Sequence, residues 1–429
     1  MNKRIIKLAI PNIISNITIP LLGIVDTALM GHLDSLIYVG AIALGSMIFN
    51  FIYWGMGFLR MGTVGFVGQA KGANNKKEIS LILYRSFSIA MIAAFAILLI
   101  HPFMIEAGLA LTNSSADIKI EALKYFNIRI WALPASLIIL SLSGWFIGMQ
   151  NTIYPMIISI TSNVLNIVIS FILVFGYQMQ AEGVALGTVI AQYIAMLIAL
   201  GMLIYRYRDF LISFVLKEIF NQKLKNFMNV NKDIFIRTLG IIFVFSFFTI
   251  KSANISDSTL AVNAILFQFF ILFSYMLDGF ANAGEALSAE AIGLRSLHML
   301  KKVVKSTFIF GLAFALIFTI VYALFGNQII RLLTDNEEII EPAAKLLLWV
   351  IAVPLISFPA FILDGIFIGA TASKAMRNTM LLAVGVVFIP ILYFGAGDEL
   401  TRLWTAFLAF MFARGLFLFL SLKRSVFSF

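Results

Sequence analysis

The chain has 429 residues, of which 61% are hydrophobic and only 12% are charged, and its mean hydropathy is +0.99. An ordinary soluble domain is about 45–50% apolar and about 25% charged, so this composition excludes that class. The net charge is +10. Because the basic residues lie in short segments between apolar runs, they indicate membrane orientation rather than nucleic-acid binding.

The apolar runs predict twelve transmembrane helices, since a helix needs roughly 20 apolar residues to cross a bilayer. In chain order they cover residues 5–31, 38–70, 80–106, 119–149, 152–176, 183–207, 231–254, 258–292, 301–327, 336–370, 375–395 and 398–422. The first run is longer than the core of a signal peptide, so we expect it to be retained. Lys and Arg gather in alternate loops, which predicts that both termini are cytoplasmic.

The two halves of the sequence repeat. GWFIG at 144–148 recurs as GIFIG at 365–369, and FNFIYWGMGFLR at 49–60 parallels FQFFILFSYMLD at 267–278. Parallel repeats are a common plan of secondary transporters. We therefore predict an all-α polytopic membrane protein with two pseudo-symmetric six-helix lobes around a central cleft. The expected divisions are an N-lobe (1–204), a basic amphipathic linker on the cytoplasmic surface (205–232) and a C-lobe (233–429).

The sequence offers little for catalysis. It contains no P-loop, no HExxH and no cysteine, which removes the common nucleotide-hydrolysing and thiolate-metal motifs. The three histidines are far apart, although spacing alone does not exclude a catalytic triad. We expect a protein that is not an enzyme, with no catalytic residues, no metal site and no cofactor other than a coupling ion.

One carboxylate, Asp26, lies inside the first apolar run, where a charge is costly and usually marks an ion or proton path. Its neighbours three and four residues away are apolar, so its partners must come from other helices. Asn163, Asn166 and Ser170 recur at helical spacing, and Thr188 could complete the group. These polar side chains either surround the carboxylate or only join helices together.

A second set of charges lies inside the predicted spans. Arg60 either neutralises a buried carboxylate or reaches the membrane interface. Lys251, Asp278, Glu285 and Asp364 fall in the second half, and their mixed signs indicate internal ion pairs. Asp278 and Asp364 could also bind a cation.

Four segments resemble the multidrug and toxic compound extrusion (MATE) family in its DinF branch. They are LAIPNIISNITIPLLGIVDTALMGHL, FIYWGMGFLRMGTVGFVGQAKG, AVNAILFQFFILFSYMLDGFANAGEALSAEAIG and LDGIFIGATASKAMRNTM. The resemblance implies a proton- or sodium-driven antiporter of cationic, amphipathic organic compounds that works by alternating access. We expect a functional monomer surrounded by lipids of the inner (plasma) membrane. A sodium-coupled antiporter and a flippase of lipid-linked precursors are the alternatives.

The resemblance also implies residue roles. It makes Asp26 the proton-coupling carboxylate, with Asn166 and Thr188 beside it. Many relatives carry a second Asp four residues after that Asn, where this chain has Ser170, so a single titrating carboxylate is the simpler scheme. The family's bending of the first helix would fall at Pro11 and Pro20, because proline removes a backbone hydrogen bond.

Overall fold

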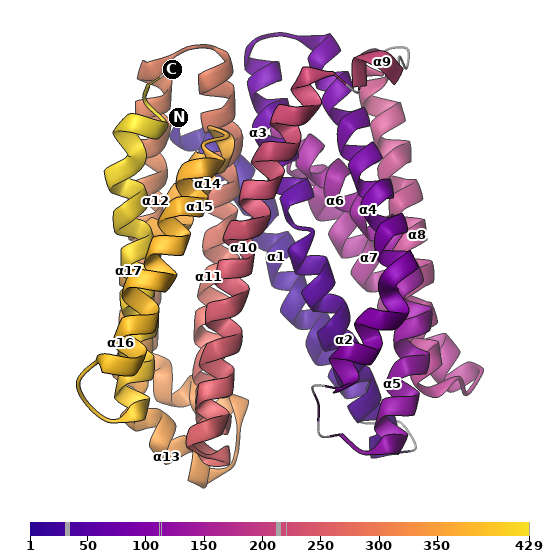
Figure 1. Cartoon of the computed structure of the whole chain (residues 1–429), viewed down its shortest axis with the longest axis vertical. Coiled ribbons are helices and arrows are strands. Elements are labelled where there is room, and N and C mark those ends of the chain that lie inside the picture. The colour runs from indigo at the N-terminus through magenta and orange to yellow at the C-terminus, as the bar shows by residue number, and fades with distance from the viewer. Residues whose placement is uncertain (31–34, 111, 113, 212–215, 220, 429) are drawn as a thin grey trace. The chain divides into compact units, whose positions relative to one another are not determined.

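The computed structural model describes residues 1–30, 35–110, 112, 114–211, 216–219 and 221–428 (Figure 1). For residues 19–30, 36, 216 and 217 it describes the backbone alone. The described residues form helices, turns and loops and contain no strand. This confirms the all-α class predicted from the apolar runs.

The helices of the first half are α1 (Asn2–Met30), α2 (Leu36–Gly55), α3 (Phe58–Gly72), α4 (Lys76–Ala110), α5 (Ala116–Arg129), α6 (Leu133–Gly148), α7 (Ile153–Phe171), α8 (Gln180–Tyr207) and α9 (Leu216–Ile219). Those of the second half are α10 (Gln222–Ile255), α11 (Asp257–Gly293), α12 (Leu297–Leu333), α13 (Glu337–Lys345), α14 (Leu347–Gly369), α15 (Ser373–Leu382), α16 (Ile389–Phe394) and α17 (Glu399–Ser425). Four short helical segments lie between them: the 3-10 helices η1 (Ile130–Ala132) and η3 (Arg208–Phe210), and the π helices η2 (Ile172–Gly176) and η4 (Ala383–Phe388).

Eleven helical stretches within the described part of the chain are long and apolar enough to cross a membrane. Helix α1, with 29 residues, lies where the first of the twelve spans was predicted but is not among these eleven. Several spans are interrupted. The span expected at 38–70 is α2 followed by α3, with a break at Met56 between Gly55 and Gly57. Glycine is a poor helix former, so a break at this place costs little stability. The span expected at 119–149 breaks at η1, just before α6, whose second residue, Pro134, has no backbone N–H donor.

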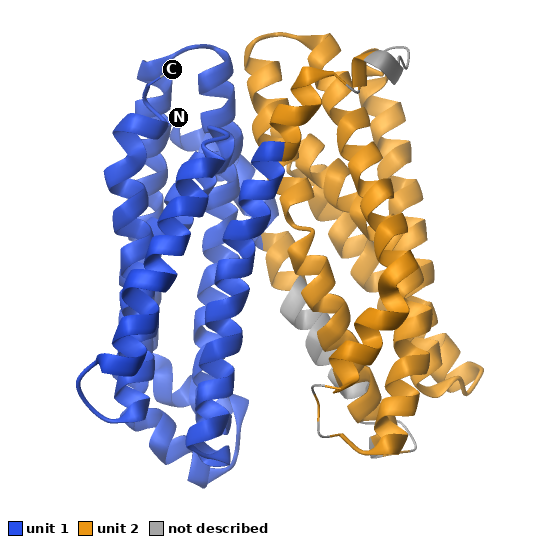
Figure 2. Cartoon of the chain, viewed as in Figure 1, with its two compact units in different colours: residues 1–13, 229–429 blue, residues 14–228 orange. Residues whose placement is uncertain are grey.

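Contacts divide the chain into two compact units (Figure 2). One contains residues 14–228, and the other contains residues 1–13 together with 229–429. Both chain termini lie at the same end of the second of these units (Figure 1). The chain passes between the units inside helices, once within α1 and once within α10.

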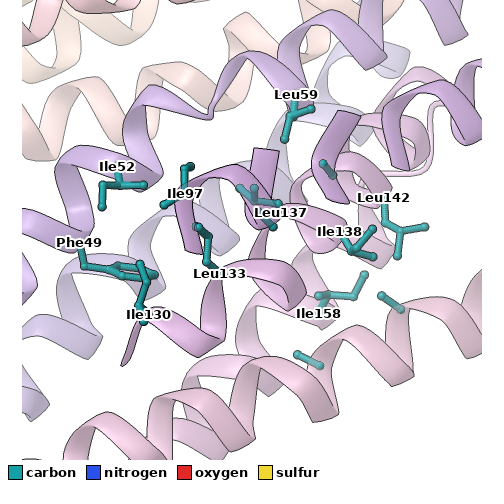
Figure 3. Packing of buried hydrophobic residues seen from close by; sticks show 14 of the residues in the cluster. Phe49, Ile52, Leu59, Ile97, Ile130, Leu133, Leu137, Ile138, Leu142 and Ile158 are labelled. Carbon is teal, nitrogen blue, oxygen red and sulfur yellow. The ribbon is translucent and has the colours of Figure 1, made fainter. Parts of the chain in front are cut away.

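The core of the 14–228 unit is built where α2, α3, α4 and α6 meet (Figure 3). Phe49, Ile52, Leu133 and Leu137 are buried there. In a membrane, lipid tails are as apolar as these side chains, so their contribution comes from close packing rather than from exclusion of water. Tight helix contacts are therefore the main determinant of this fold.

The repeated glycines make the same contact in each unit. A methyl group added at Gly144 of α6 would lie 2.5 Å from the main-chain oxygen of Arg60 in α3, and one at Gly365 of α14 would collide with the main-chain oxygen of Ala281 in α11. Because Gly has no Cβ, each pair of helices can approach to backbone contact. The recurrence of GWFIG as GIFIG thus corresponds to a repeated helix–helix contact.

Candidate functional site

A polar stripe runs along α7 and faces α8. Ser162, Asn166 and Ser170 are spaced four residues apart on α7 and are buried. The Asn166 amide Nδ2 donates to the Thr188 hydroxyl at 2.8 Å, and Gln192 Nε2 donates to the Ser162 hydroxyl at 3.2 Å. The structure thus brings together Asn166, Ser170 and Thr188, three of the four polar residues singled out in the sequence.

Two atoms of this stripe keep unused hydrogen-bonding capacity. Asn166 Oδ1 and Ser170 Oγ are buried and have no partner among the described residues. Thr188 does not fill the gap, because its hydroxyl donates to the Val184 carbonyl at 3.0 Å. Buried polar atoms in proteins nearly always have a partner. The stripe therefore presents one acceptor and one hydroxyl that a further group can use.

The neighbouring face of α7 contacts α1. Asn163, the fourth polar residue, donates from Nδ2 to the Thr18 hydroxyl at 2.9 Å. Asp26 and Pro20 lie farther along α1, and their side chains are outside the described residues. Pro11 is buried in the first part of the same helix. Beside it, Asn12 Nδ2 donates to the Leu8 carbonyl at 2.9 Å.

Two cations predicted as charge partners have different surroundings. Arg60 is half-buried at the start of α3. Lys251 is half-buried in α10, with its ammonium 5.2 Å from the ring centre of Tyr393 and 5.9 Å from that of Phe247. Aromatic faces attract a cation at this range.

The acids of the second half divide between two helices. Asp278 is half-buried and Glu285 is buried, both on α11. Asp364 is buried on α14 and accepts from two arginines that the sequence reasoning missed, Arg237 of α10 and Arg414 of α17. Each interrupts an otherwise apolar run, and that interruption is the signal that could have revealed them. Within the described residues, no three His, Asp or Glu side chains are close enough to hold a metal ion.

Comparison with known protein families identifies the family of this chain. A sequence model of the MatE family matches residues 11–172 and 234–394. The chain belongs to the MATE family. DNA damage-inducible protein F of Escherichia coli (strain K12) is 37% identical over 418 residues, which cover 97% of this chain and 90% of that protein. This places the MATE chain in the DinF branch and confirms the resemblance seen in its motifs.

More distant similarities include a further sequence relative and a solved structure with the same fold. The probable multidrug resistance protein NorM of Bacillus cereus is 22% identical over 91% of this chain and 87% of its own length. A crystal structure of MATE in the bent conformation has a TM-score of 0.88 at 16% identity and covers 99% of this chain and 95% of that one. MATE proteins are transporters, so this chain is a multi-pass membrane transporter and not an enzyme, as predicted.

Proposed function

We propose that this protein exports cationic, amphipathic organic compounds across the inner membrane in exchange for protons, with Asp26 as the group that carries the proton. The protein would act as a monomer surrounded by lipid, with both termini in the cytoplasm. Both termini lie at the same end of one unit (Figure 1), which supports their being on the same side of the membrane. The observation that carries the proposal is the unused acceptor and hydroxyl of α7.

Helix geometry supports a place for Asp26 beside these atoms. Thr18 and Asn163 are in contact, and α1 and α7, the first and fifth spans, run in the same direction because successive spans alternate. Asp26 follows Thr18 by eight residues and Ser170 follows Asn163 by seven. At 1.5 Å per residue these steps are about 12 Å and about 10 Å. The main chain at Asp26 therefore reaches the level of Ser170.

The two unused atoms suit the two states of a carboxyl group. A protonated carboxyl donates a hydrogen bond, whereas an ionised one only accepts. Asn166 Oδ1 is an acceptor for the first state, and the Ser170 hydroxyl can donate to the second. In the proposed cycle, Asp26 takes up a proton from outside, the compound leaves outward, and the proton is released inward.

A single coupling carboxylate also predicts the driving force. One proton exchanged for one monovalent cation moves no net charge, so the pH gradient alone drives the exchange. The membrane potential, which supplies about 2.3 kcal/mol per charge at 100 mV, does not contribute to such a cycle.

The test is efflux of a fluorescent monovalent organic cation from proteoliposomes with an imposed pH gradient. We expect Asp26→Asn to abolish proton-driven efflux while the purified variant still binds the cation. Asp117→Asn removes an exposed carboxylate from the start of α5 and should transport like the wild type. Undiminished efflux by Asp26→Asn would contradict the role of Asp26, and efflux that follows only a sodium gradient would replace the proton with Na⁺.

A further inference from the structure

Two arginines share one buried carboxylate in the unit formed mainly by residues 229–429. Arg237 and Arg414 each direct a terminal guanidinium nitrogen at the same atom, Asp364 Oδ2, and the Arg414 contact is 2.5 Å long. The side chains of Arg237, Asp364 and Arg414 are 8%, 9% and 3% exposed. We call Arg237 and Arg414 the arginine pair. It joins α10, α14 and α17 at one point.

The arginine pair has more donors than this carboxylate can use. Each guanidinium carries five N–H donors. Nε of Arg237 and Nε of Arg414 are buried and have no acceptor in the part of the chain that the structure describes. Arg414 Nη1 donates to the weak acceptor Met411 Sδ at 3.4 Å. Buried charged groups require partners, so these surplus donors are suited to another acceptor.

A structural ion pair in the same unit has a different arrangement. Asp233 accepts from Arg377 at 2.6 Å through Oδ1 and from the Ser373 hydroxyl at 2.9 Å through Oδ2. One cation there meets one carboxylate, and both carboxylate oxygens are used. At the arginine pair, two cations meet one oxygen.

We propose that the arginine pair is a binding site for the carboxylate group of an amphipathic organic compound. A guanidinium can hold a carboxylate through two parallel hydrogen bonds, and the buried Nε donors are available for that geometry. The rings of Phe410, which is buried, and Phe361, which is half-buried, lie 5.6 Å and 5.9 Å from the Arg414 guanidinium carbon. The half-buried Phe361 ring would contact the apolar body of the compound. This site extends the ligand range beyond the cations of the proposed function and does not depend on Asp26.

The direct test is equilibrium binding to the full-length protein in nanodiscs of zwitterionic lipid, measured by calorimetry without any proton gradient. The probes are 2-naphthylacetate, its neutral amide and 2-naphthylethylammonium, which share a ring and differ in charge. We expect the carboxylate to bind at least about tenfold more tightly than the amide, since a hydrogen bond to a charged group is worth about that factor. Arg237→Gln and Arg414→Gln should each weaken it about tenfold, while Lys251→Gln, at the aromatic site of α10, should not.

Asp364→Asn distinguishes a ligand site from a structural ion pair. Removing the competing carboxylate frees both guanidinium groups, so we expect 2-naphthylacetate to bind about tenfold more tightly and to raise the melting temperature more than in the wild type. A purely structural trio would give a less stable variant whose melting temperature the probe does not change. This comparison decides the question even where an arginine variant fails to fold.

Two further results would overturn the proposal. One is equal binding of the carboxylate, the amide and the ammonium. The other is loss of carboxylate binding when the nanodiscs contain anionic lipid, because a lipid headgroup would then occupy the arginine pair. Neither result depends on proton-driven efflux, so a failure here is separate from a failure of the proposed antiport.

Discussion

Two buried asparagines in this protein differ in how fully their side-chain amides are hydrogen-bonded. Asn263 uses both ends of its amide: Nδ2 donates to the Ser252 hydroxyl at 2.8 Å, and Oδ1 accepts from Trp404 Nε1 at 3.1 Å. Asn166 donates to Thr188 but leaves Oδ1 without a partner among the described residues. A fully bonded amide fixes helices, whereas a half-used one can respond to a group that gains and loses a proton.

Replacing the two asparagines should separate these roles. Asn263→Leu leaves the Trp404 donor buried without an acceptor, which should lower stability by about 1–3 kcal/mol. Asn166→Leu leaves no buried donor without an acceptor, because the Thr188 hydroxyl donates to the Val184 carbonyl of its own helix. We expect a smaller loss of stability but at least severalfold slower proton-driven efflux. Thermal unfolding in detergent and efflux from proteoliposomes measure the two effects.

The neighbouring amide is the matched control for that prediction. Gln192 donates to Ser162 on the same pair of helices, one turn away from Asn166. Gln192→Leu should change efflux less than Asn166→Leu. Equal effects of the two substitutions would assign the whole stripe to helix packing.

At the scale of helices, glycine determines which elements approach most closely. Gly365→Ala places a methyl group against the main-chain oxygen of Ala281, which cannot rotate away as a side chain can. We expect a loss of about 1–3 kcal/mol, typical of overpacked sites, and a similar loss for Gly144→Ala. Thermal unfolding of the purified variants measures both.

A glycine without neighbours provides the control. Gly201 of α8 is exposed, and a methyl group there would meet nothing within 4 Å. Gly201→Ala should raise stability by about 0.5–1 kcal/mol, because glycine lowers the stability of a helix interior. If Gly365→Ala and Gly201→Ala melt alike, the close approach of α11 and α14 does not limit stability.

The sequence was sufficient to predict elements that depend on local patterns. Apolar runs predicted the spans, and the motif recurring at 144–148 and 365–369 marked a contact that recurs in both units. The Asn166–Thr188 pair was also anticipated, since the two residues lie on successive helices. Arg237 and Arg414 were not, because they reach Asp364 across 127 and 50 residues of sequence. Nothing local distinguishes such a cation from one that extends to the membrane surface.

At the scale of the whole chain, the segment between the two halves is fastened to the 14–228 unit. Arg85 of α4 is only 1% exposed. It donates to Glu78 at 2.8 Å, to the Ile219 carbonyl at 3.2 Å and to Asn221 Oδ1 at 3.2 Å. Lys223 donates to the other oxygen of Glu78 at 2.7 Å. This group of contacts holds the end of the connecting segment against α4.

Arg85→Gln should release that segment. The substitution removes the cation that donates to Glu78, to the carbonyls of Glu218 and Ile219 and to Asn221 Oδ1. Breaking a buried ion pair is strongly destabilising. We expect faster cleavage by trypsin after Lys223 and Lys225 in the folded protein, measured by limited proteolysis. Lys77→Gln removes an exposed ion pair with Glu218, which is worth little, and should leave the rate nearly unchanged. Equal rates in both variants would show that Arg85 does not hold the segment.

Helix α10 begins at Gln222, beside these contacts, and continues without a break to Ile255, past the boundary between the units at residues 228 and 229. Each residue added to a continuous helix both lengthens it and rotates the residues that follow. One residue inserted at that boundary would turn everything beyond it by about 100°, whereas an insertion of about a full turn, 3.6 residues, nearly restores the phase. The tolerance of α10 to insertions near residues 228 and 229 should therefore follow the helical period rather than the number of residues added.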